Sequence, residues 1–394
     1  MDIQALLKQM VDEKASDLYL TAGTAAQIRV DGVPRPIGEP LEADELQRAA
    51  HSLMNERQIR DFEFHLECNF ATDLTGIGRF RCNLLRQRGM VSMVIRRIQA
   101  SIPDLEEINL PLMLGELAQA RSGLVLVVGP AGVGKSTTLA AMLNHRNKHC
   151  HGHILTIEDP VEYLYKHEKS VVNQREVGLD TKSFSSALKN AMREAPDAIL
   201  IGEILDADTM SYALNFAKSG HLCLASLHAN TSREAFERIT NFFEPEMRSQ
   251  ILYEMSMIMK GVIAQRLVAS TDNKRVPALE IVLPQPEICE LLQNAKLGEL
   301  NRKIEDSNHK DMMSFDQALY KLYIDGKISR EEALRQATSA TDLDLKIRLN
   351  NSNSSAPPIS QTPSYGCSDK KDPRKEIEPE KQSLGGGIRL DLEF

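Results

Sequence analysis

No stretch of the sequence is apolar over the roughly 20 residues that a membrane-spanning helix needs. The strongest apolar run, Leu124 to Val128, has only the length of a strand. The N-terminus also lacks the basic, apolar and small-residue order of a secretory signal. We therefore expect a cytoplasmic chain with no membrane span of its own.

Paired cysteines and excess positive charge are absent as well. The 6 cysteines are scattered without a C-x-x-C pair, which gives no recognisable zinc-site spacing and fits reduced thiols. The 47 Lys and Arg residues are outnumbered by 55 Asp and Glu residues, so the net charge is −8. Such a balance provides no general attraction to nucleic acid or to an anionic bilayer. We expect no nucleic-acid partner.

The 394 residues suggest about two domains, and 42% of them are hydrophobic, enough for sizeable cores. Residues 1–98 have the pattern of a small α+β domain, and 99–111 that of an interdomain linker. From 112 to 349 apolar strands alternate with helices, which predicts a parallel α/β sheet. Within it, the apolar stripe over 246–267 predicts one long helix. Few large apolar residues occur over 350–394, which predicts a disordered tail.

The strongest motif lies between the Leu124 to Val128 strand and a helical pattern. It has the G-x-x-x-x-G-K-[ST] spacing of a phosphate-binding loop in the required strand-to-helix context. Its glycines allow backbone N–H groups to converge on phosphate oxygens at a helix N-terminus. Lys135 is expected to reach the β- and γ-phosphates, and the Ser136 hydroxyl to ligate Mg²⁺. The nucleotide-binding residues predicted here are Gly129, Pro130, Ala131, Gly132, Val133, Gly134, Lys135, Ser136 and Thr137.

Three carboxylates follow apolar strands at the edge where this loop lies. Glu203 comes after the strand 198–201, the place of an acid that binds Mg²⁺ through water or positions the attacking water. Glu158 ends another strand, and Pro160 makes a turn that returns Glu162 to the same edge. A solvated loop carboxylate is the simpler interpretation of any one of them. Three such acids in a P-loop protein favour the interpretation that they take part in catalysis.

Two histidines bracket a further strand. His221 and His228 are seven residues apart, so they point to opposite faces of a strand and are poorly placed to share a metal ion. We expect separate roles, one sensing the γ-phosphate and one supporting the fold. Arg79 and Arg81 share a face of an N-terminal strand. They either point toward a nucleotide on another domain or subunit, or are surface charges.

The order of the motifs resembles a known family. The P-loop is followed by I-E-D-P-V-E-Y, V-N-Q-R-E-V-G, I-G-E and G-H-L-C-L-A-S-L-H-A-N, which is similar to the secretion-superfamily hexameric ATPases. Over residues 1–348 the chain is most similar to the PilT/PilU family of type IV pilus retraction ATPases. The segments E-C-N-F-A at 67–71 and F-D-Q-A-L-Y at 315–320 resemble its PilU type. A PilT paralogue of equal length is the alternative.

This resemblance implies a PAS-like N-terminal domain, a RecA-like P-loop ATPase domain, and a homohexameric ring that binds ATP and Mg²⁺ between subunits. It implies Glu162 as the catalytic base and Glu203 as the Walker B acid that holds Mg²⁺ together with Ser136. Arginines matching Arg81 and Arg96 meet the phosphates in such rings. Further catalytic or nucleotide-binding positions implied by the family motifs are His228, His221 and Glu158.

The implied function is ATP-driven type IV pilus retraction, which powers twitching motility, with a PilU-type accessory role. The expected location is the cytoplasmic face of the inner membrane, beside an inner-membrane pilus platform protein and a second retraction ATPase. The alternative is a nucleotide-binding accessory subunit with little turnover of its own. One departure supports that alternative, because many relatives have an arginine two residues after the Walker B glutamate, where this chain has Leu205.

Overall fold

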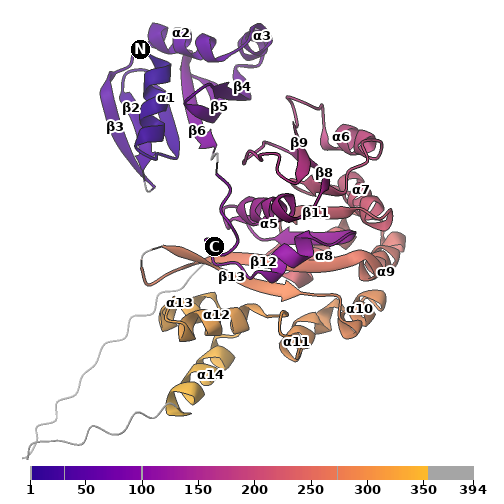
Figure 1. Cartoon of the computed structure of the whole chain (residues 1–394). Helices are drawn as coiled ribbons and strands as arrows, with labels where there is room; N and C mark the ends of the chain where they lie inside the picture. The colour runs from indigo at the N-terminus through magenta and orange to yellow at the C-terminus, as the bar shows by residue number, and fades with distance from the viewer. Residues whose placement is uncertain (1, 31, 99–100, 273, 354–394) are drawn as a thin grey trace, which may run out of the picture. The chain divides into compact units, whose positions relative to one another are not determined.

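The computed structural model describes residues 2–30, 32–98, 101–272 and 274–353, and Figure 1 shows their elements. The chain up to Ile347 forms one compact unit. Within the described residues, no helix is both long and apolar enough to cross a bilayer. Most of the predicted disordered tail, 354–394, lies outside the described residues, whereas helix α14 runs to Asn353 and so passes the predicted boundary at 349.

The N-terminal domain is an antiparallel sheet of six strands in the order β3-β2-β1-β6-β5-β4. Helix α2 packs against β6 and β1, and α3 packs against β4. A buried core of alternating strand residues, including Leu18, Phe80 and Ile95, lies under these helices. The elements are β1 Asp17–Thr21, β2 Ala25–Val30, β3 Val33–Pro40, β4 Glu67–Leu74, β5 Gly78–Gln87, β6 Met90–Ile98, α1 Ile3–Asp12, α2 Ala43–Leu53 and α3 Glu56–His65.

Local sequence determines two boundaries in this domain. Arg88 and Gly89 both have positive φ, 52° and 77°, which forms the tight turn between β5 and β6 that two-residue hairpins favour. The helical pattern over 43–65 is divided in two, because Met54 is extended and Asn55 starts α3 with a capping box to Gln58. The first N–H groups of a helix have no acceptor within it, and this capping box supplies acceptors where α3 starts.

The second domain contains a seven-stranded sheet in the order β13-β12-β7-β11-β10-β8-β9. All neighbours pair in parallel except β13, which is antiparallel to β12. Strands β7 and β11 are buried along their whole length, as expected for central strands covered on both faces. The strands are β7 Gly123–Val128, β8 Gly152–Glu158, β9 Ser170–Glu176, β10 Ala198–Ile201, β11 Leu222–Leu227, β12 Met259–Ala269 and β13 Arg275–Val282.

The single long helix predicted over 246–267 is wrong. Helix α9 ends at Ile258, and the chain continues directly as strand β12 between β7 and β13. The segment around Val262 and Ile263 is buried among both neighbouring strands. A continuous apolar run fits a buried strand as well as a helix, and here the β-branched residues indicate the strand. Strand β9 is a further element that the sequence pattern did not reveal.

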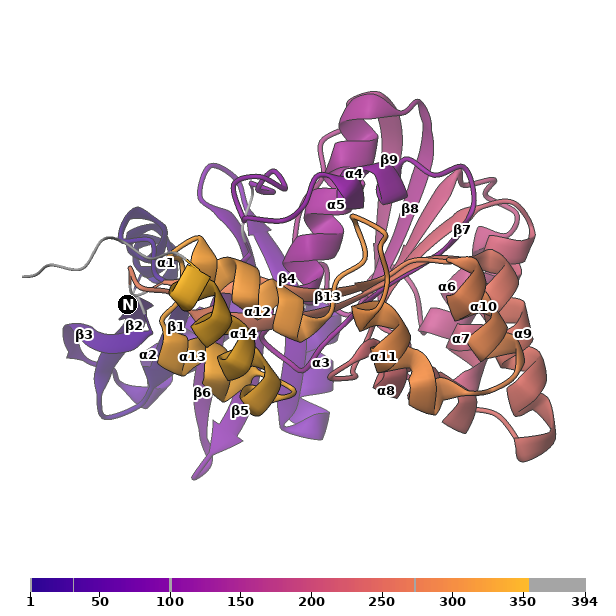
Figure 2. The same ribbon diagram turned by 90° about the horizontal axis from the view of Figure 1, so that it is seen from below.

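Helices cover this sheet and continue beyond it. Helix α10 packs against α9, α12 packs against β13, and α13 follows α12 (Figures 1 and 2). The parallel strands end at one edge of the sheet, which is where α/β proteins bind ligands. The helices are α4 Met113–Ala118, α5 Lys135–His149, α6 Phe184–Ala191, α7 Ala207–Lys218, α8 Ser232–Asn241, α9 Arg248–Ile258, α10 Pro286–Gln293, α11 Leu300–Glu305, α12 Phe315–Ile324, α13 Arg330–Gln336 and α14 Ala340–Asn353.

Candidate active site

The predicted phosphate-binding loop connects the end of β7 to the start of α5. Gly132 and Gly134 have φ of 78° and 88°, a left-handed backbone that residues with a Cβ rarely adopt. At Gly129 a Cβ would lie 2.7 Å from the Gln265 carbonyl oxygen and from a Val133 methyl group. Glycine is therefore required at these positions by backbone conformation and by close packing. The loop ends where Lys135 begins α5.

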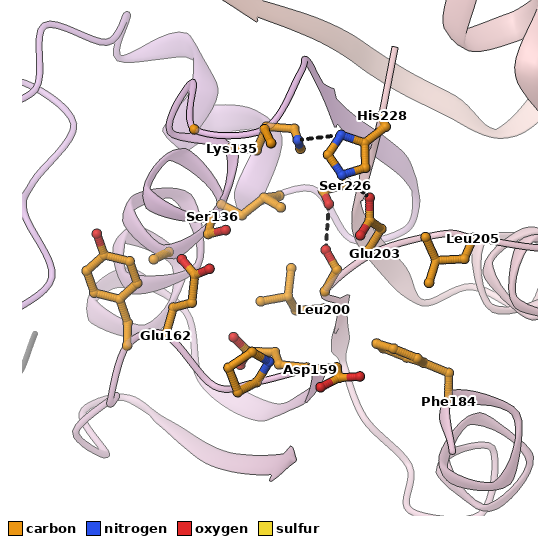
Figure 3. Close-up of a pocket in the computed structure, with 18 of the residues that line it drawn as sticks. Lys135, Ser136, Asp159, Glu162, Phe184, Leu200, Glu203, Leu205, Ser226 and His228 are labelled. Atoms are coloured by element: carbon orange, nitrogen blue, oxygen red, sulfur yellow. Dashed lines mark hydrogen bonds and ion pairs between the residues drawn. The ribbon is translucent and has the colours of Figure 1, made fainter. Parts of the chain in front are cut away.

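A cavity of about 320 Å³ opens beside this loop (Figure 3). Figure 3 shows Ser136 and Glu162 on one side of it and Phe184 and Leu205 on the other. Its polar walls come from the segments that follow β7, β8, β10 and β11. The edge of the sheet therefore brings together residues that lie far apart in the sequence. The polar and loop residues that line it are Ala131, Gly132, Lys135, Ser136, Glu158, Asp159, Pro160, Glu162, Tyr163, Tyr165, Gly202, Glu203, Ser226 and His228.

Lys135 is held by acceptors at the mouth of the loop. Its Nζ donates to the Gly129 and Pro130 carbonyl oxygens at 2.8 and 3.0 Å and to His228 Nδ1 at 3.3 Å. Burial lowers the pKa of Lys135, while the charges of Glu203 and Glu162 act in the opposite direction. The ammonium is thus a partly desolvated positive charge beside two carboxylates, a setting in which its field on an anion is strong.

His228 lies between Lys135 and Glu203. Because an ammonium group has no acceptor, His228 Nδ1 must accept from Lys135, and the neutral ring then carries its proton on Nε2. His228 Nε2 lies 2.8 Å from Glu203 Oε1. That oxygen is nevertheless buried without a hydrogen bond of good geometry. Glu203 therefore retains acceptor capacity that faces the cavity.

The residues present fit Mg²⁺. The Glu203 carboxylate, whose Oε1 lies against His228 but makes no hydrogen bond, and the exposed hydroxyl of Ser136 both border the cavity. Oxygen is the ligand atom that Mg²⁺ prefers. Among the described residues, no group of three or more His, Cys, Asp or Glu side chains is placed to hold a metal by itself. Mg²⁺ typically uses one or two protein ligands together with substrate phosphates and water. We propose Ser136 and Glu203 for that role.

The loop after β8 places Glu162 at the cavity. On one side of Glu162, the Val161 N–H donates to Glu176 Oε2 at 3.2 Å. On the other, the Tyr163 hydroxyl lies 2.9 Å from Thr137 Oγ1 on α5. Glu162 itself is exposed and lines the cavity. Both neighbours are anchored while the carboxylate between them is accessible, which is the arrangement that a general base needs.

Glu158 differs from the other two acids because it is almost fully enclosed, with 9% of its surface exposed. It accepts a hydrogen bond from Thr156 Oγ1 at 2.6 Å. Burial raises the pKa of Glu158 to about 7, against the opposing effect of hydrogen bonds from Thr156 and Gln174. A Cβ at Gly202 would lie 3.1 Å from Glu158 Cα, so the glycine before Glu203 allows β8 and β10 to approach.

Glu158 is expected to make stability fall as pH rises. An acid whose pKa is raised in the folded state holds a proton that the unfolded chain releases. The protonated Glu158 therefore stabilises the native state at pH values below its ordinary pKa of 4.5, and this stabilisation is lost as the pH rises to about 7. The difference corresponds to about 3 kcal/mol. Glu158→Gln should flatten the decline of the free energy of unfolding between pH 5 and pH 8, measured by urea denaturation. The exposed control Glu168→Gln should keep the wild-type slope, and an unchanged slope for Glu158→Gln would contradict the assignment.

Other predicted residues lie in different places. His221 is at the opposite end of β11 from His228, and its Nδ1 lies 3.3 Å from the Phe216 carbonyl oxygen. Its ring stacks edge-on against Phe216, and it is not among the residues that line the cavity. Arg79 forms an ion pair with the buried carboxylate of Glu176 at 3.3 Å.

Arg81 and Arg96 border a second, smaller cavity. Its volume is about 190 Å³, and Arg97, Glu162 and Tyr163 also line it. Arg96 Nε donates to Asp17 Oδ1 at 2.9 Å, which fixes part of its guanidinium. The loop carrying Glu162 therefore borders both cavities, with the P-loop at the first and the arginines at the second.

Sequence reasoning missed several residues of the site. Ser226 donates to the Gly202 carbonyl oxygen at 2.6 Å, beside Glu203, and its place near the end of β11 was the available signal. Phe184 and Leu200 supply apolar walls, and nothing in their sequence context distinguishes them from ordinary core residues. Tyr163 belongs to the motif I-E-D-P-V-E-Y, but its contact with Thr137 cannot be seen without the fold.

Comparisons with known proteins agree with this geometry. The family model of the type II/IV secretion system protein matches residues 1–314. The type IV pilus ATPase PilU of Pseudomonas aeruginosa is 46% identical over 89% of this chain and 92% of its own. The type IV pilus retraction ATPase PilT of the same species is 39% identical over 86% of this chain and 98% of its own. A crystal structure of the pilus retraction motor PilT with bound ADP superposes with a TM-score of 0.83 at 38% identity, covering 88% of this chain and 99% of that one.

Proposed function

Because the chain belongs to the type II/IV secretion system protein family and, within it, to the PilT/PilU pilus ATPases, we propose that it drives type IV pilus retraction as a PilU-type accessory to a main retraction ATPase. The protein is an ATPase with an N-terminal α+β domain and a RecA-like ATPase domain. The greater identity to PilU than to PilT, 46% against 39%, supports the PilU-type assignment.

One observation carries the proposal. Four chemically required groups from three separate segments meet at one cavity, namely the Lys135 ammonium, the Ser136 hydroxyl, and the carboxylates of Glu162 and Glu203. Phosphoryl transfer depends mainly on positioning and on stabilising negative charge, and these groups supply both. A domain that used its P-loop only to bind nucleotide would need no exposed, anchored carboxylate opposite it.

Each residue has a distinct proposed role. The backbone of Gly129–Thr137 cradles the phosphates, and Lys135 offsets the negative charge that develops on the transferred group. Glu162 accepts a proton from the attacking water. His228, between Lys135 and Glu203, responds to the position of the lysine. Mg²⁺, held by Ser136 and Glu203 with the phosphates, would neutralise charge on the leaving group.

We further propose a homohexamer at the cytoplasmic face of the inner membrane, with an inner-membrane pilus platform protein and a second retraction ATPase as partners. The similarity to PilU, a type IV pilus ATPase, and to PilT, a pilus retraction motor, supports a place for this chain at the pilus machinery. A site completed by Arg81 and Arg96 of another subunit would explain why these arginines lie on the N-terminal domain.

The second candidate is a nucleotide-binding accessory subunit with little turnover. It is favoured by Leu205, which lines the cavity with 54% of its surface exposed and carries no charge toward the phosphates. Intact Lys135, Glu162 and Glu203 favour turnover. The steady-state ATPase rate of the purified protein decides between the two candidates.

Arg81→Ala and Arg96→Ala are each expected to lower the maximal ATPase rate while ADP binding persists. An arginine that stabilises transition-state charge contributes on the order of 10³-fold or more in such sites. If it comes from a neighbouring subunit, specific activity also rises with protein concentration as rings assemble. The measurement pairs ATPase rates with sedimentation velocity.

A matched control is Arg57→Ala, which removes an exposed arginine of helix α3 in the same domain. It should leave both rate and assembly unchanged. Wild-type turnover by a monomer, independent of concentration, would disprove the ring. Wild-type rates in both arginine variants would remove their proposed role while leaving the ATPase assignment in place.

A further inference from the structure

Gln265 is a buried polar residue that contacts the phosphate-binding loop from a distant part of the chain. It lies on β12, with 3% of its surface exposed. Its Nε2 donates to the Val133 carbonyl oxygen at 2.6 Å. Its Oε1 accepts from Thr138 Oγ1 at 2.7 Å. Both ends of the amide are thereby occupied by the loop and the first turn of α5.

The sheet register explains why Gln265 can reach the loop. Strands β12 and β7 pair in parallel with Ala264 opposite Val128, so Gln265 lies beside Gly129, where β7 ends. The fit is tight, because a Cβ at Gly134 would lie 3.1 Å from Gln265 Nε2. The Gln265 side chain therefore packs against Gly134, and its backbone carbonyl oxygen packs against Gly129.

The hydrogen bond to Val133 determines more than local packing. In a trans peptide the carbonyl of one residue and the N–H of the next point in opposite directions. Holding the Val133 carbonyl toward β12 directs the Gly134 N–H away from β12. Within the described part of the chain, that N–H donates no hydrogen bond to protein. The next residues, Lys135 and Ser136, line the cavity.

We propose that Gln265 is a positioning residue for the ATPase reaction. It fixes the peptide plane between Val133 and Gly134, so that the Gly134 N–H is presented to a nucleotide β-phosphate without rearrangement of the loop. Backbone N–H groups of P-loops cradle this phosphate, and donors that are already oriented lower the cost of binding. The contact with Thr138 serves the fold, because it joins α5 to the sheet.

The test compares variants that remove the two side-chain hydrogen bonds of Gln265 together or one at a time. Gln265→Leu removes both contacts, Gln265→Glu keeps the acceptor for Thr138 but lacks the donor to Val133, and Thr138→Val removes only the other contact. Mg-ADP and AMP are the probes, measured by isothermal titration, because AMP lacks the β-phosphate. Thermal melting of each variant records its effect on the fold.

We expect Gln265→Leu and Gln265→Glu to raise the Kd for Mg-ADP about tenfold while the Kd for AMP changes less than about twofold. Thr138→Val should melt at a lower temperature yet bind Mg-ADP within about twofold of wild type. Equal losses for ADP and AMP, or the same ADP loss in Thr138→Val, would show that Gln265 only supports the fold.

A measurement on the unaltered protein makes the test independent of whether variants fold. The Gly134 amide should exchange its hydrogen more slowly when Mg-ADP is bound than when AMP is bound. Equal exchange of this amide with the two nucleotides would overturn the proposal.

Discussion

Lys135→Ala is expected to abolish ATP turnover, with a loss on the order of 10³-fold or more, while the protein stays folded. The ammonium is the positive charge that lies at the loop mouth, 2.8 Å from the Gly129 carbonyl oxygen and beside two carboxylates. Negative charge that develops on the transferred phosphoryl group would find no counter-charge there after the substitution. Removal of a preorganised charge from such a site costs several kcal/mol in the barrier, about 3 to 4 in comparable cases.

The stability of the Lys135→Ala variant follows from where its partners lie. Lys135 itself lines the cavity, so after its truncation water from the cavity can replace it as a donor to the Gly129 and Pro130 carbonyl oxygens. A suitable control is Lys148→Ala on the same helix, whose side chain pairs with Asp104 away from the cavity. Steady-state phosphate release is the measurement. A rate within a few-fold of wild type in Lys135→Ala would refute the active-site assignment.

Glu162→Gln is expected to lower the maximal ATPase rate by about 10² to 10⁴-fold, the usual contribution of a general base. The amide preserves the volume and the hydrogen-bonding reach of the side chain but cannot accept a proton from water. Because the loop is anchored through Val161 and Tyr163, the substitution should leave the backbone in place. Mg-ADP affinity should therefore remain close to that of wild type.

Two comparisons make the Glu162 assignment specific. Glu203→Gln should weaken Mg-dependent nucleotide binding as well as turnover, because the Glu203 carboxylate is proposed to hold the metal and its charge favours a divalent cation. Glu168→Gln changes an exposed acid shortly after the same loop and should have no effect. The measurements are the ATPase rates and the Mg-ADP titrations of Glu162→Gln, Glu203→Gln and Glu168→Gln. If Glu203→Gln alone impairs the rate, the base is not Glu162.

The sequence predicts most of the P-loop sheet because its signals are local. The strand of Leu124 to Val128, the glycine spacing and the carboxylates after apolar strands each depend on neighbours within a few residues. The turn at Arg88 and Gly89 is predictable for the same reason. That the parallel strands end together is a property of the fold class, so Glu162 and Glu203 could be placed at one edge in advance.

What could not be predicted depends on tertiary contacts. The segment after Ile258 becomes a strand because β7 and β13 offer it two partners, which the apolar pattern does not record. Strand β9 has a mixed burial pattern at the end of the sheet, so its period is weak. Gln265 contacts Val133 across more than a hundred residues of sequence. No local pattern indicates that a glutamine on a buried strand will fix a loop.

The hydroxyl contact between Tyr163 and Thr137 ties the loop of Glu162 to the helix that begins with Lys135. The proposed base and the phosphate cradle are therefore joined through a direct contact, and we expect them to move together as one body. In the proposed hexamer, we expect opening and closing of the ring to leave the distance from base to cradle nearly constant. Control of turnover by subunit motion must then act through groups outside this body, and Arg81 and Arg96 on the N-terminal domain are placed to provide it.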